Sequence, residues 1–572
     1  MNTLETDHGP RRPAYEALAH DLKNRGIDAV FGLMSDDVAL FVSTLDAIGV
    51  RFHAARHENN AVAMAEGYAA ATGRLGVAIL GRGPATANAL NGAMYALRTG
   101  SPVLLILGAS AMAQRSSGGQ APSPDPKAFN VQGVLGAAGF RSFLATDAQT
   151  ARQMLANAID ATQQGTCAAL LLPRDVQAGL VDDPGPMVPP CAVPAAQGPR
   201  VAARPAAIEA AATLLGRSRR PLFVVGLGAH RSGAREALER LADQVGAVLA
   251  TTLKAKDMFR GHAYNLGIIG SFSHGAARRL IDQADCVVVF GAGMNPRTTS
   301  YGSALPQDVP LIHVDLARAN IGRWFHADVA LVADARSAAE QLIGALPERA
   351  AADKPFHTED TRLRLAEFDP ASEFQPAHTA RTMDPRALAI ELDRLLPQDR
   401  NAVYDAGNFL QILPYISVPG PDQLKNSVDF ASIGMGFGTA LGFARGAPQR
   451  PTVLFVGDGG LLMTLGELET VVREDIPLVI VVMNDCAYGA ELHFLKMRGM
   501  PVTTSLFPDV DFAPVAQAFG FHAETVRTLD ELRRLAPLLQ NPQGPILLDC
   551  KINASVAAAF HLESAEHERK KA

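Results

Sequence analysis

The sequence has few cysteines, little surplus charge and no long apolar segment. Its five cysteines among 572 residues are odd in number and lack metal-site spacing, as is typical of a reducing cytoplasm. A formal net charge of −6 gives no electrostatic reason to bind nucleic acid or anionic membrane. No apolar stretch approaches the roughly 20 residues that span a bilayer, and the N-terminal residues lack the apolar core of a secretory signal. We therefore expect a cytoplasmic protein with neither nucleic-acid nor membrane partners.

The length and the pattern of apolar segments predict several α/β domains. A chain of 572 residues is too long for one hydrophobic core. Linkers are expected at 185–204, which is rich in Pro and Ala, and at 346–383, which is polar and charged. Strand-like and helix-like segments alternate between them, which predicts three doubly wound parallel-sheet domains. We place these domains at 10–184, 205–350 and 380–555, followed by a tail or lid at 556–572.

Residues 451–490 carry the most informative pattern in the chain. Thr452–Val456 and Pro477–Met483 are short apolar runs that predict buried parallel strands. Leu461–Arg473 between them has helical amphipathicity. Each strand is followed by a turn with an acidic residue, and in a βαβ unit both turns lie at the carboxyl edge of the sheet, where such folds bind ligands. The first turn contains Gly457, Asp458, Gly459 and Gly460, and the second contains Asn484 and Asp485.

The chemistry of these two turns indicates a metal-bridged phosphate. Glycine turns at a helix N-terminus let backbone N–H groups approach an anion closely. Asp458 would repel a phosphate, so its presence makes sense only with a hard cation between them. Asp485 and the backbone carbonyl of Ala487 offer two further oxygens. Three protein oxygens, two phosphate oxygens and a water would complete the octahedron that Mg²⁺ requires.

Gly-Asp-Gly followed by 24 residues and Asn-Asp resembles the cofactor signature of thiamine diphosphate enzymes. The resemblance is to the acetolactate synthase, pyruvate decarboxylase and 2-hydroxyacyl-CoA lyase superfamily, and it covers essentially the whole chain. The family usually ends this motif with Asn-Asn, so Asp485 departs from it but keeps an oxygen ligand. The resemblance implies pyrimidine-binding, central and diphosphate-binding domains, thiamine diphosphate and Mg²⁺. It also implies a homodimer or homotetramer with active sites at the dimer interface. The alternative is an ordinary crossover with an Asp-Gly turn.

A second part of the resemblance lies near the N-terminus. The segment Ala54–Arg74 is similar to the pyrimidine-binding domain of this family. This implies that Glu58 hydrogen-bonds the aminopyrimidine ring and activates the cofactor by proton transfer, and that it comes from the partner chain. General acid–base assistance of this kind is worth about 10²–10⁴ in rate. The alternative is a first-turn glutamate favoured by the helix dipole.

The C-terminal domain contains further residues that the resemblance assigns. Gly407 and Asn408 match the loop that contacts the diphosphate, although a plain β-turn is an alternative. Ile433 matches the apolar wedge that bends the cofactor, and Ala431 would accept the aminopyrimidine N–H through its carbonyl; a core aliphatic is the alternative for Ile433. Glu491 stands where decarboxylases and some acyl-CoA lyases carry a proton donor, with an exposed helical glutamate as its alternative.

Several expected substrate-facing positions depart from the acetolactate synthase pattern. Leu-Met-Ser replaces the usual x-Pro-Gly turn after Gly32, Gly-Pro-Ala replaces Gly-Pro-Gly, and Ala-Phe-Asn replaces Ala-Phe-Gln. Residues 118–126 have the composition of a loop at the active-site lip. The positions expected near the substrate are Leu33, Met34, Gly83, Phe129, Asn130, His493 and Phe494.

Two glycine pairs in the central domain each follow an apolar strand. Gly226-Leu-Gly228 and Gly291-Ala-Gly293 invite a dinucleotide interpretation, but neither is followed by the third glycine of the fingerprint. We favour a purely structural role and keep FAD or an adenine nucleotide as an alternative.

The pattern as a whole favours a thiamine diphosphate-dependent, acetolactate-synthase-like carboligase acting on a 2-oxo acid. A 2-hydroxyacyl-CoA lyase or a 2-oxo acid decarboxylase using Glu491 is the alternative among enzymes. A non-catalytic nucleotide- or flavin-binding regulatory protein is the alternative from another class. Glu58 counts against that last alternative, because a degenerate relative is expected to lose its proton relay first.

Overall fold

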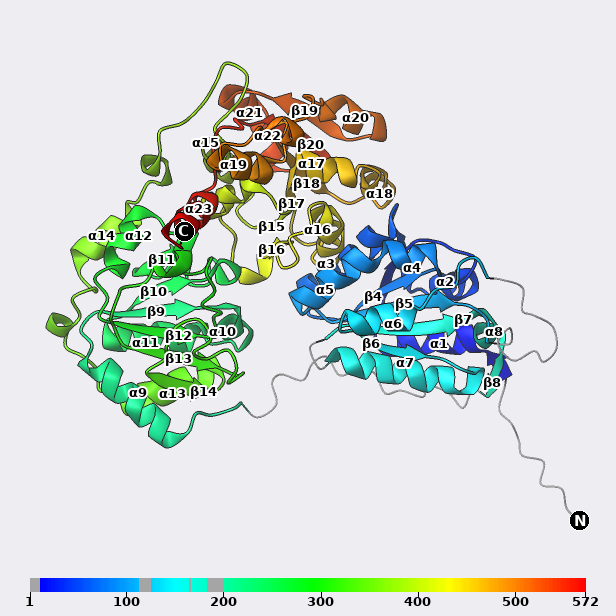
Figure 1. Ribbon diagram of the computed structural model, residues 1–572, viewed down its shortest axis with the longest axis horizontal. Helices are drawn as coiled ribbons and strands as arrows, with labels where there is room; N and C mark the ends of the chain where they lie inside the picture. The colour runs from blue at the N-terminus through cyan, green and yellow to red at the C-terminus, as the bar shows by residue number, and fades with distance from the viewer. Residues whose placement is uncertain (1–10, 113–124, 164–165, 183–199, 572) are drawn as a thin grey trace, which may run out of the picture.

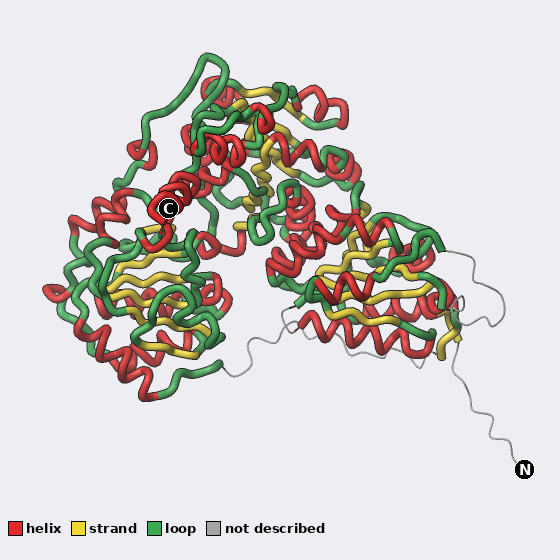
Figure 2. Tube along the Cα trace, viewed as in Figure 1, coloured by secondary structure: helices red, strands yellow, loops and turns green. Residues whose placement is uncertain are grey.

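The computed structural model describes residues 11–112, 125–163, 166–182 and 200–571. Three six-stranded parallel sheets, each enclosed by helices, form three domains (Figures 1 and 2). The predicted α/β class with three doubly wound sheets is confirmed. Most of the linker expected at 185–204 and most of the loop expected at 118–126 lie outside the described residues. In the described part of the chain, no helix combines the length and the apolar character needed to cross a membrane.

The N-terminal domain has strand order β3-β2-β4-β5-β7-β6, and separate cores cover its two faces. Every residue of β4 is buried, which explains why the strands read as continuous apolar runs. A short antiparallel pair, β1 and β8, joins the two ends of the domain. The strands are β1 (Arg11–Pro13), β2 (Ala29–Gly32), β3 (Arg51–Ala54), β4 (Gly76–Leu80), β5 (Val103–Ala109), β6 (Arg141–Leu144), β7 (Ala168–Pro173) and β8 (Leu180–Asp182). The helices are α1 (Ala14–Asn24), α2 (Ala39–Ala47), α3 (Glu58–Thr72), α4 (Pro84–Asn88), α5 (Leu90–Thr99), α6 (Val131–Ala137), α7 (Ala148–Gln163) and α8 (Arg174–Ala178).

The central domain has the order β11-β10-β9-β12-β13-β14, the arrangement of a doubly wound dinucleotide fold. The strands are β9 (Pro221–Val225), β10 (Val248–Thr251), β11 (Asn265–Ile268), β12 (Cys286–Phe290), β13 (Leu311–Asp315) and β14 (Val329–Val332). The helices are α9 (Pro205–Arg217), α10 (Leu227–Arg231), α11 (Arg235–Val245), α12 (Gly275–Ile281), α13 (Ala335–Ala345) and α14 (Glu359–Ala366).

The two glycine pairs of the central domain pack against each other. A Cβ on Gly226 would lie 2.3 Å from the carbonyl oxygen of Gly291, and the Gly228 N–H donates to that same oxygen at 3.0 Å. Close contact between two backbone turns therefore accounts for Gly226, Gly228 and Gly291, whereas a Cβ on Gly293 would have no described neighbour within 4 Å. The FAD alternative is not supported.

The C-terminal domain has the order β16-β15-β17-β18-β20-β19, which repeats the topology of the N-terminal domain. The strands are β15 (Asn401–Tyr404), β16 (Leu424–Asn426), β17 (Thr452–Gly457), β18 (Leu478–Asn484), β19 (His522–Val526) and β20 (Ile546–Lys551). The helices are α15 (Pro385–Leu395), α16 (Met435–Gly446), α17 (Asp458–Met463), α18 (Glu467–Arg473), α19 (Gly489–Met497), α20 (Phe512–Phe519), α21 (Leu529–Arg534), α22 (Ala536–Gln540) and α23 (Ala559–Lys571).

One predicted helix is wrong in its extent. The segment expected as a single helix over Leu461–Arg473 forms two, α17 and α18, separated at Thr464–Gly466. The first helix ends at Met463, and the hydroxyl of the next residue, Thr464, donates to the carbonyl of Gly460. The break turns the start of α18 toward the N-terminal domain.

The N- and C-terminal domains dock through two helices rich in small residues, α3 and α16 (Figure 1). A Cβ on Gly442 would lie 1.8 Å from the carbonyl oxygen of Met64, so the two backbones touch. Gly438 packs on Asn60 and Gly446 on Tyr68 and Ala71, so the helices run parallel. The N-terminal end of α3 therefore lies beside the N-terminal end of α16.

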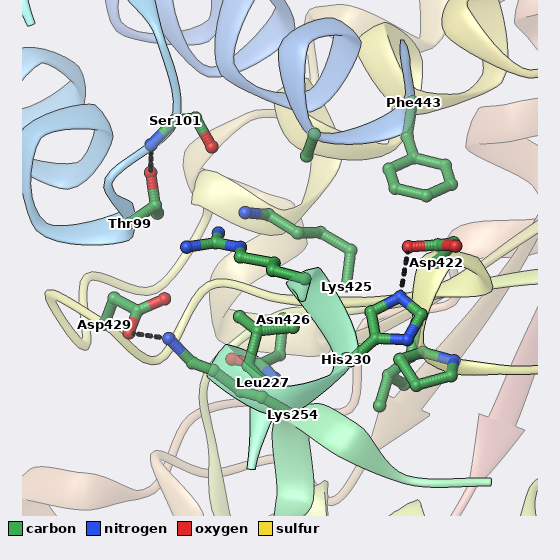
Figure 3. Close-up of a pocket in the computed structure, with 14 residues that line it drawn as sticks. Thr99, Ser101, Leu227, His230, Lys254, Asp422, Lys425, Asn426, Asp429 and Phe443 are labelled. Atoms are coloured by element: carbon green, nitrogen blue, oxygen red, sulfur yellow. Dashed lines mark hydrogen bonds and ion pairs between the residues drawn. The ribbon is translucent and has the colours of Figure 1, made fainter. Parts of the chain in front are cut away.

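The three domains meet around a small cavity of about 130 Å³ (Figure 3). His230 of the central domain pairs with Asp422 at 2.6 Å, and Lys254 pairs with Asp429 at 2.5 Å. Lys425 reaches across to Glu66 of the N-terminal domain. Because these cations already have acidic partners, the cavity is explained as a junction between domains.

The C-terminal helix α23 links the C-terminal and central domains. Tyr301 of the central domain donates to Ser564 at 3.0 Å, and its ring stacks on His567. Glu568 pairs with Arg498, which follows α19. Most of the segment expected as a tail or lid at 556–572 is therefore a helix with specific partners.

Candidate active site

Asp458 and Asp485 lie at the carboxyl edge of the C-terminal sheet. They follow the adjacent parallel strands β17 and β18, whose last residues include the pair Gly457 and Met483. Asp458 is the first residue of α17, and its Oδ1 accepts the N–H of Gly459 at 3.0 Å. Its buried Oδ2 has no hydrogen-bond partner among the described residues. A buried acceptor of this kind calls for a ligand or a cation.

The electrostatics of this pair favour a cation strongly. Burial, and then the neighbouring Asp485, raise the pKa of Asp458 to about 8. Burial raises the pKa of Asp485 to about 7. Two neighbouring carboxyl groups with raised pKa values, one buried and one half-buried, hold their charges poorly unless a positive group lies between them. Carboxylate oxygens are the ligands that Mg²⁺ prefers, so the residues fit a magnesium ion.

Asp405, which the sequence did not single out, holds the loops around the cofactor site together. It is fully buried at the end of β15, where Gly434 N–H donates to its carboxylate at 2.6 Å and Gly436 N–H at 3.0 Å. A Cβ on Gly460 would lie 2.4 Å from Asp405 Oδ2. Burial raises its pKa, although these backbone donors oppose the shift. Asp405 thus fixes the loop before α16 against the first turn of α17.

Two residues beside the site adopt left-handed backbone conformations. Ala431 has φ +57° and Cys486 has φ +56°. Such conformations are uncommon outside glycine, and they gather at ligand sites, where the surrounding structure enforces them. Ala431 is the residue whose carbonyl was expected to meet the aminopyrimidine, and Cys486 lies between Asp485 and Ala487 in the second turn.

Ile433 and Glu58 lie at the same end of the paired helices. Ile433 is half-buried two residues before the start of α16, and its role as a wedge against the cofactor stays a prediction. Glu58 is the first residue of α3 and is 8% exposed. Asn88 donates to Glu58 Oε2 at 3.1 Å, and Asn91 donates to Ser432 Oγ at 2.8 Å. Within one chain, Glu58 therefore lies at the same end of the helix pair as the loop that carries Ile433; its contact with the cofactor, its origin from a partner chain and the oligomeric state stay predictions.

The side chain of Asn408 holds the segment before α23 in place. Asn408 begins the 3₁₀ helix η7 (Asn408–Tyr415) directly after Gly407. Its Nδ2 donates to the carbonyl of Val556 at 3.0 Å, and its Oδ1 accepts the N–H of Ala558 at 2.9 Å. The side-chain amide thus fastens the segment before α23, which leaves the backbone here as the predicted diphosphate contact.

The residues expected on α19 lie on different sides of that helix. Glu491 is exposed in the first turn, and Phe494 is also exposed. His493 is buried, and burial lowers its pKa against the opposing effect of a hydrogen bond to the backbone at Val556. A Cβ on Gly489 would lie 2.5 Å from Asp485 Oδ2, so α19 begins in direct contact with the acidic turn.

The substrate-facing residues predicted in the N-terminal domain fall in two places. Phe129 and Asn130 border a cavity of about 390 Å³ that Gly83 also lines. The backbone around Gly83 is pressed against Lys127, and a Cβ there would lie 2.5 Å from the Lys127 carbonyl oxygen. Leu33 is half-buried and Met34 exposed just after β2. Their contact with a substrate stays a prediction.

Comparison with known proteins agrees with this geometry. Family models match all three domains: thiamine pyrophosphate enzyme, N-terminal TPP binding domain, at residues 12–129; central domain at 208–342; and C-terminal TPP binding domain at 405–550. The chain belongs to the thiamine pyrophosphate enzyme family. It is a thiamine pyrophosphate-dependent enzyme, so the non-catalytic alternative is not supported.

Relatives in this family carry out different reactions according to their names. The chain is 26% identical over 545 residues to the acetolactate synthase isozyme 2 large subunit of Escherichia coli, covering 94% of this chain and 95% of that protein. It is 29% identical over 528 residues to a probable 2-ketoarginine decarboxylase of Pseudomonas aeruginosa, covering 91% and 90%. It is 27% identical over 559 residues to the sulfoacetaldehyde acetyltransferase of Castellaniella defragrans, covering 92% and 89%.

Proposed function

We propose that this thiamine pyrophosphate enzyme requires Mg²⁺ and forms or breaks a C–C bond next to the carbonyl of a 2-oxo acid. Acetolactate-synthase-like carboligation is the first choice, in line with the overall sequence pattern and with the relatives named acetolactate synthase. The observation that carries the proposal is the pair of Asp458, which is buried, and Asp485, which is half-buried; their raised pKa values call for a cation. A homodimer or homotetramer in the cytoplasm belongs to the same proposal.

Different residues of the chain would bind the metal, the diphosphate and the aminopyrimidine ring. Asp458, Asp485 and the Ala487 carbonyl would hold Mg²⁺, while the backbone of Gly459 and Gly460 at the start of α17 would bind the diphosphate. When bound, thiamine diphosphate supplies an acidic C–H whose conjugate base adds to a carbonyl carbon.

Glu58 would carry out the proton transfer that activates the cofactor. Its buried carboxyl group, oriented by Asn88, would exchange a proton at the ring nitrogen of the aminopyrimidine. The Ala431 carbonyl would accept the amino N–H of that ring, and Ile433 would press on the cofactor to keep it bent. Asp405 holds the backbone of both loops in place.

A decarboxylase or 2-hydroxyacyl-CoA lyase is the second candidate. Glu491 favours it, because this carboxyl group is unburied in the first turn of α19, immediately after the acidic turn. From there it would deliver a proton to the product side of the reaction, which releases an aldehyde in place of a ligated product. The relative named 2-ketoarginine decarboxylase is compatible with this alternative.

Cofactor content followed by product analysis tests the proposal. The purified protein is denatured, and the supernatant is assayed for thiamine diphosphate and Mg²⁺. The loaded enzyme is then given a panel of 2-oxo acids, with pyruvate converted to acetolactate expected for the first candidate and aldehyde release for the second. A thioester panel tests the lyase. Full activity after dialysis without thiamine diphosphate or divalent metal would refute both candidates.

Glu58→Gln tests the proton relay within this proposal. The amide keeps the shape and a hydrogen bond but cannot exchange the proton. Turnover is expected to fall by about 10²–10⁴ with the cofactor still bound. Steady-state kinetics and a cofactor titration measure the two quantities separately, and wild-type turnover in this variant would remove the assignment.

A further inference from the structure

Glu467, a buried residue of the C-terminal domain, contacts the turn of the N-terminal domain that precedes Glu58. It is 1% exposed at the start of α18. Its Oε1 accepts the backbone N–H of Arg56 at 2.9 Å and that of His57 at 3.2 Å. The side chain of Asn60 donates to the same oxygen at 2.9 Å. A single carboxylate oxygen therefore gathers three donors from the other domain.

The contact lies at the N-terminal end of α3. The first N–H groups of a helix, and those just before it, have no intrahelical partner and carry partial positive charge. A carboxylate from outside the helix satisfies these groups and fixes the direction in which the helix starts. Glu58 follows His57 directly, so whatever fixes this turn also fixes the Glu58 backbone.

Glu467 itself is held firmly in the metal-binding domain. Thr470 Oγ1 donates to Glu467 Oε2 at 2.6 Å from the next turn of α18. The helix α18 follows α17, whose first residue is Asp458, after the break at Thr464–Gly466. The break at Thr464–Gly466 lets α18 start in a different direction from α17. The short segment from Asp458 to Glu467 therefore connects the predicted metal site to the start of α3.

We propose that Glu467 is a positioning residue that sets Glu58 against the cofactor ring across the domain interface. This inference rests on the proposed function, in which Glu58 exchanges a proton with that ring. The hydrogen bonds of Glu467 go to the turn before Glu58, to Asn60 and to Thr470, so its effect on the reaction is expected to pass through Glu58. Misplacing a reacting group by about 1 Å costs on the order of 10²-fold in rate.

Glu467→Gln and Glu58→Gln, singly and together, test the proposal. Glu467→Gln keeps the volume but offers an amide to donors that need a carboxylate. We expect turnover to fall by about 10–10² while KM for the 2-oxo acid stays within twofold. In the Glu58→Gln background the added loss from Glu467→Gln should vanish, because there is no proton relay left to misplace.

The control is Glu469→Gln on the same helix. Glu469 binds the Arg56 side chain at 2.6 Å and Arg473, and in the described part of the chain it has no hydrogen bond to the backbone of the turn. Its variant is expected to keep turnover within twofold. Thr470→Val, which removes only the hydroxyl that orients Glu467, serves if Glu467→Gln does not fold and should show a smaller loss of the same kind.

The outcomes separate the inference from the function. Equal fractional losses in the wild-type and Glu58→Gln backgrounds would overturn the positioning role, as would unchanged turnover in both Glu467→Gln and Thr470→Val. Wild-type turnover in Glu58→Gln would instead overturn the proposed function. Hydrogen exchange of the peptide containing Arg56 and His57 gives an independent readout, which should rise in Glu467→Gln and stay unchanged in Glu469→Gln.

Discussion

At the scale of single residues, the sequence identifies acidic residues that directly follow an apolar strand. Asp458 and Asp485 were recognisable because each ends an apolar run and precedes glycine or a turn. The Asp405 and Glu467 contacts gave no local signal, since their partners lie far away in the chain. Arg56 and Glu467 are 411 residues apart. Single acidic residues in such positions look like ordinary surface charge until the fold is known.

Asp458→Asn tests whether the acidic pair is built for a cation. The substitution keeps the shape but removes a carboxyl group whose ionisation is opposed by burial and then by Asp485. The apparent Tm of the metal-free protein is expected to rise by about 2–4 °C for each kcal/mol of this penalty removed. The stabilisation that Mg²⁺ gives the parent protein should disappear. Differential scanning fluorimetry with and without Mg²⁺ and thiamine diphosphate measures both effects.

The matched control for this variant is Asp475→Asn. Asp475 is an exposed acid of the same domain with φ +50°, a conformation that Asn adopts readily. It should leave the Tm and its Mg²⁺ response unchanged. A lower metal-free Tm together with an intact Mg²⁺ response in Asp458→Asn would contradict the cation site.

At the scale of helices and strands, periodicity found the elements but not their interruptions or partners. The apolar runs Thr452–Val456 and Pro477–Met483 form β17 and β18, with bounds that differ from the prediction by at most one residue at each end. The break between α17 and α18 was missed, because amphipathicity continues across Thr464–Gly466. The strand orders were also beyond reach, since apolar runs do not specify their neighbours in a sheet. The small residues of α3 and α16 gave no indication that the two helices touch.

Gly442→Ala tests the contact between α3 and α16. The new methyl group would lie 1.8 Å from the Met64 carbonyl oxygen, so the helices must move apart. The expected cost is about 1–3 kcal/mol or more, as for other overpacked sites, together with a loss of turnover because Glu58 moves with α3. Thermal unfolding and steady-state kinetics measure the two effects.

Gly344→Ala in α13 is the control for that substitution. Among the described residues, no neighbouring atom would lie within 4 Å of a Cβ added at this position. Ala is also favoured over Gly in a helix by roughly 0.5–1 kcal/mol. The control should leave turnover unchanged and not lower the Tm. Unchanged stability and turnover in Gly442→Ala would show that α3 and α16 are not in backbone contact at this position.

At the scale of the whole molecule, the three α/β domains followed from chain length, linkers and alternating segments. Their docking did not, because it depends on contacts such as the charged cluster around Glu474. His53 of the N-terminal domain meets Glu474 at 2.8 Å, and Arg51 meets it at 3.2 Å. Arg445 and Arg473 reach the same carboxylate from the C-terminal domain at 3.1 Å and 2.6 Å. Glu474 is thus the centre of an ionic contact between domains.

This cluster makes domain docking sensitive to acid. Burial opposes ionisation of Glu474, but hydrogen bonds from His53 and Arg445 outweigh it and lower its pKa to about 2. Its contribution to stability is complete above about pH 4.5, the unfolded value, and is lost as the pH falls toward 2. Burial lowers the pKa of His53 despite the adjacent Glu474. The unfolded chain therefore takes up this proton first, and stability also falls as the pH drops below 6.5.

His53→Gln tests the upper part of this pH range. The variant can still donate a hydrogen bond to Glu474 but has no group to protonate in the unfolded chain. The decline in unfolding free energy between pH 6.5 and 5 should become shallower, by at most about 1.4 kcal/mol per pH unit. Denaturant unfolding at a series of pH values measures it, with the exposed His522→Gln as the control that should keep the parent slope. If His53→Gln keeps the parent protein's dependence of unfolding free energy on pH, the proton uptake that destabilises the protein occurs at groups other than His53.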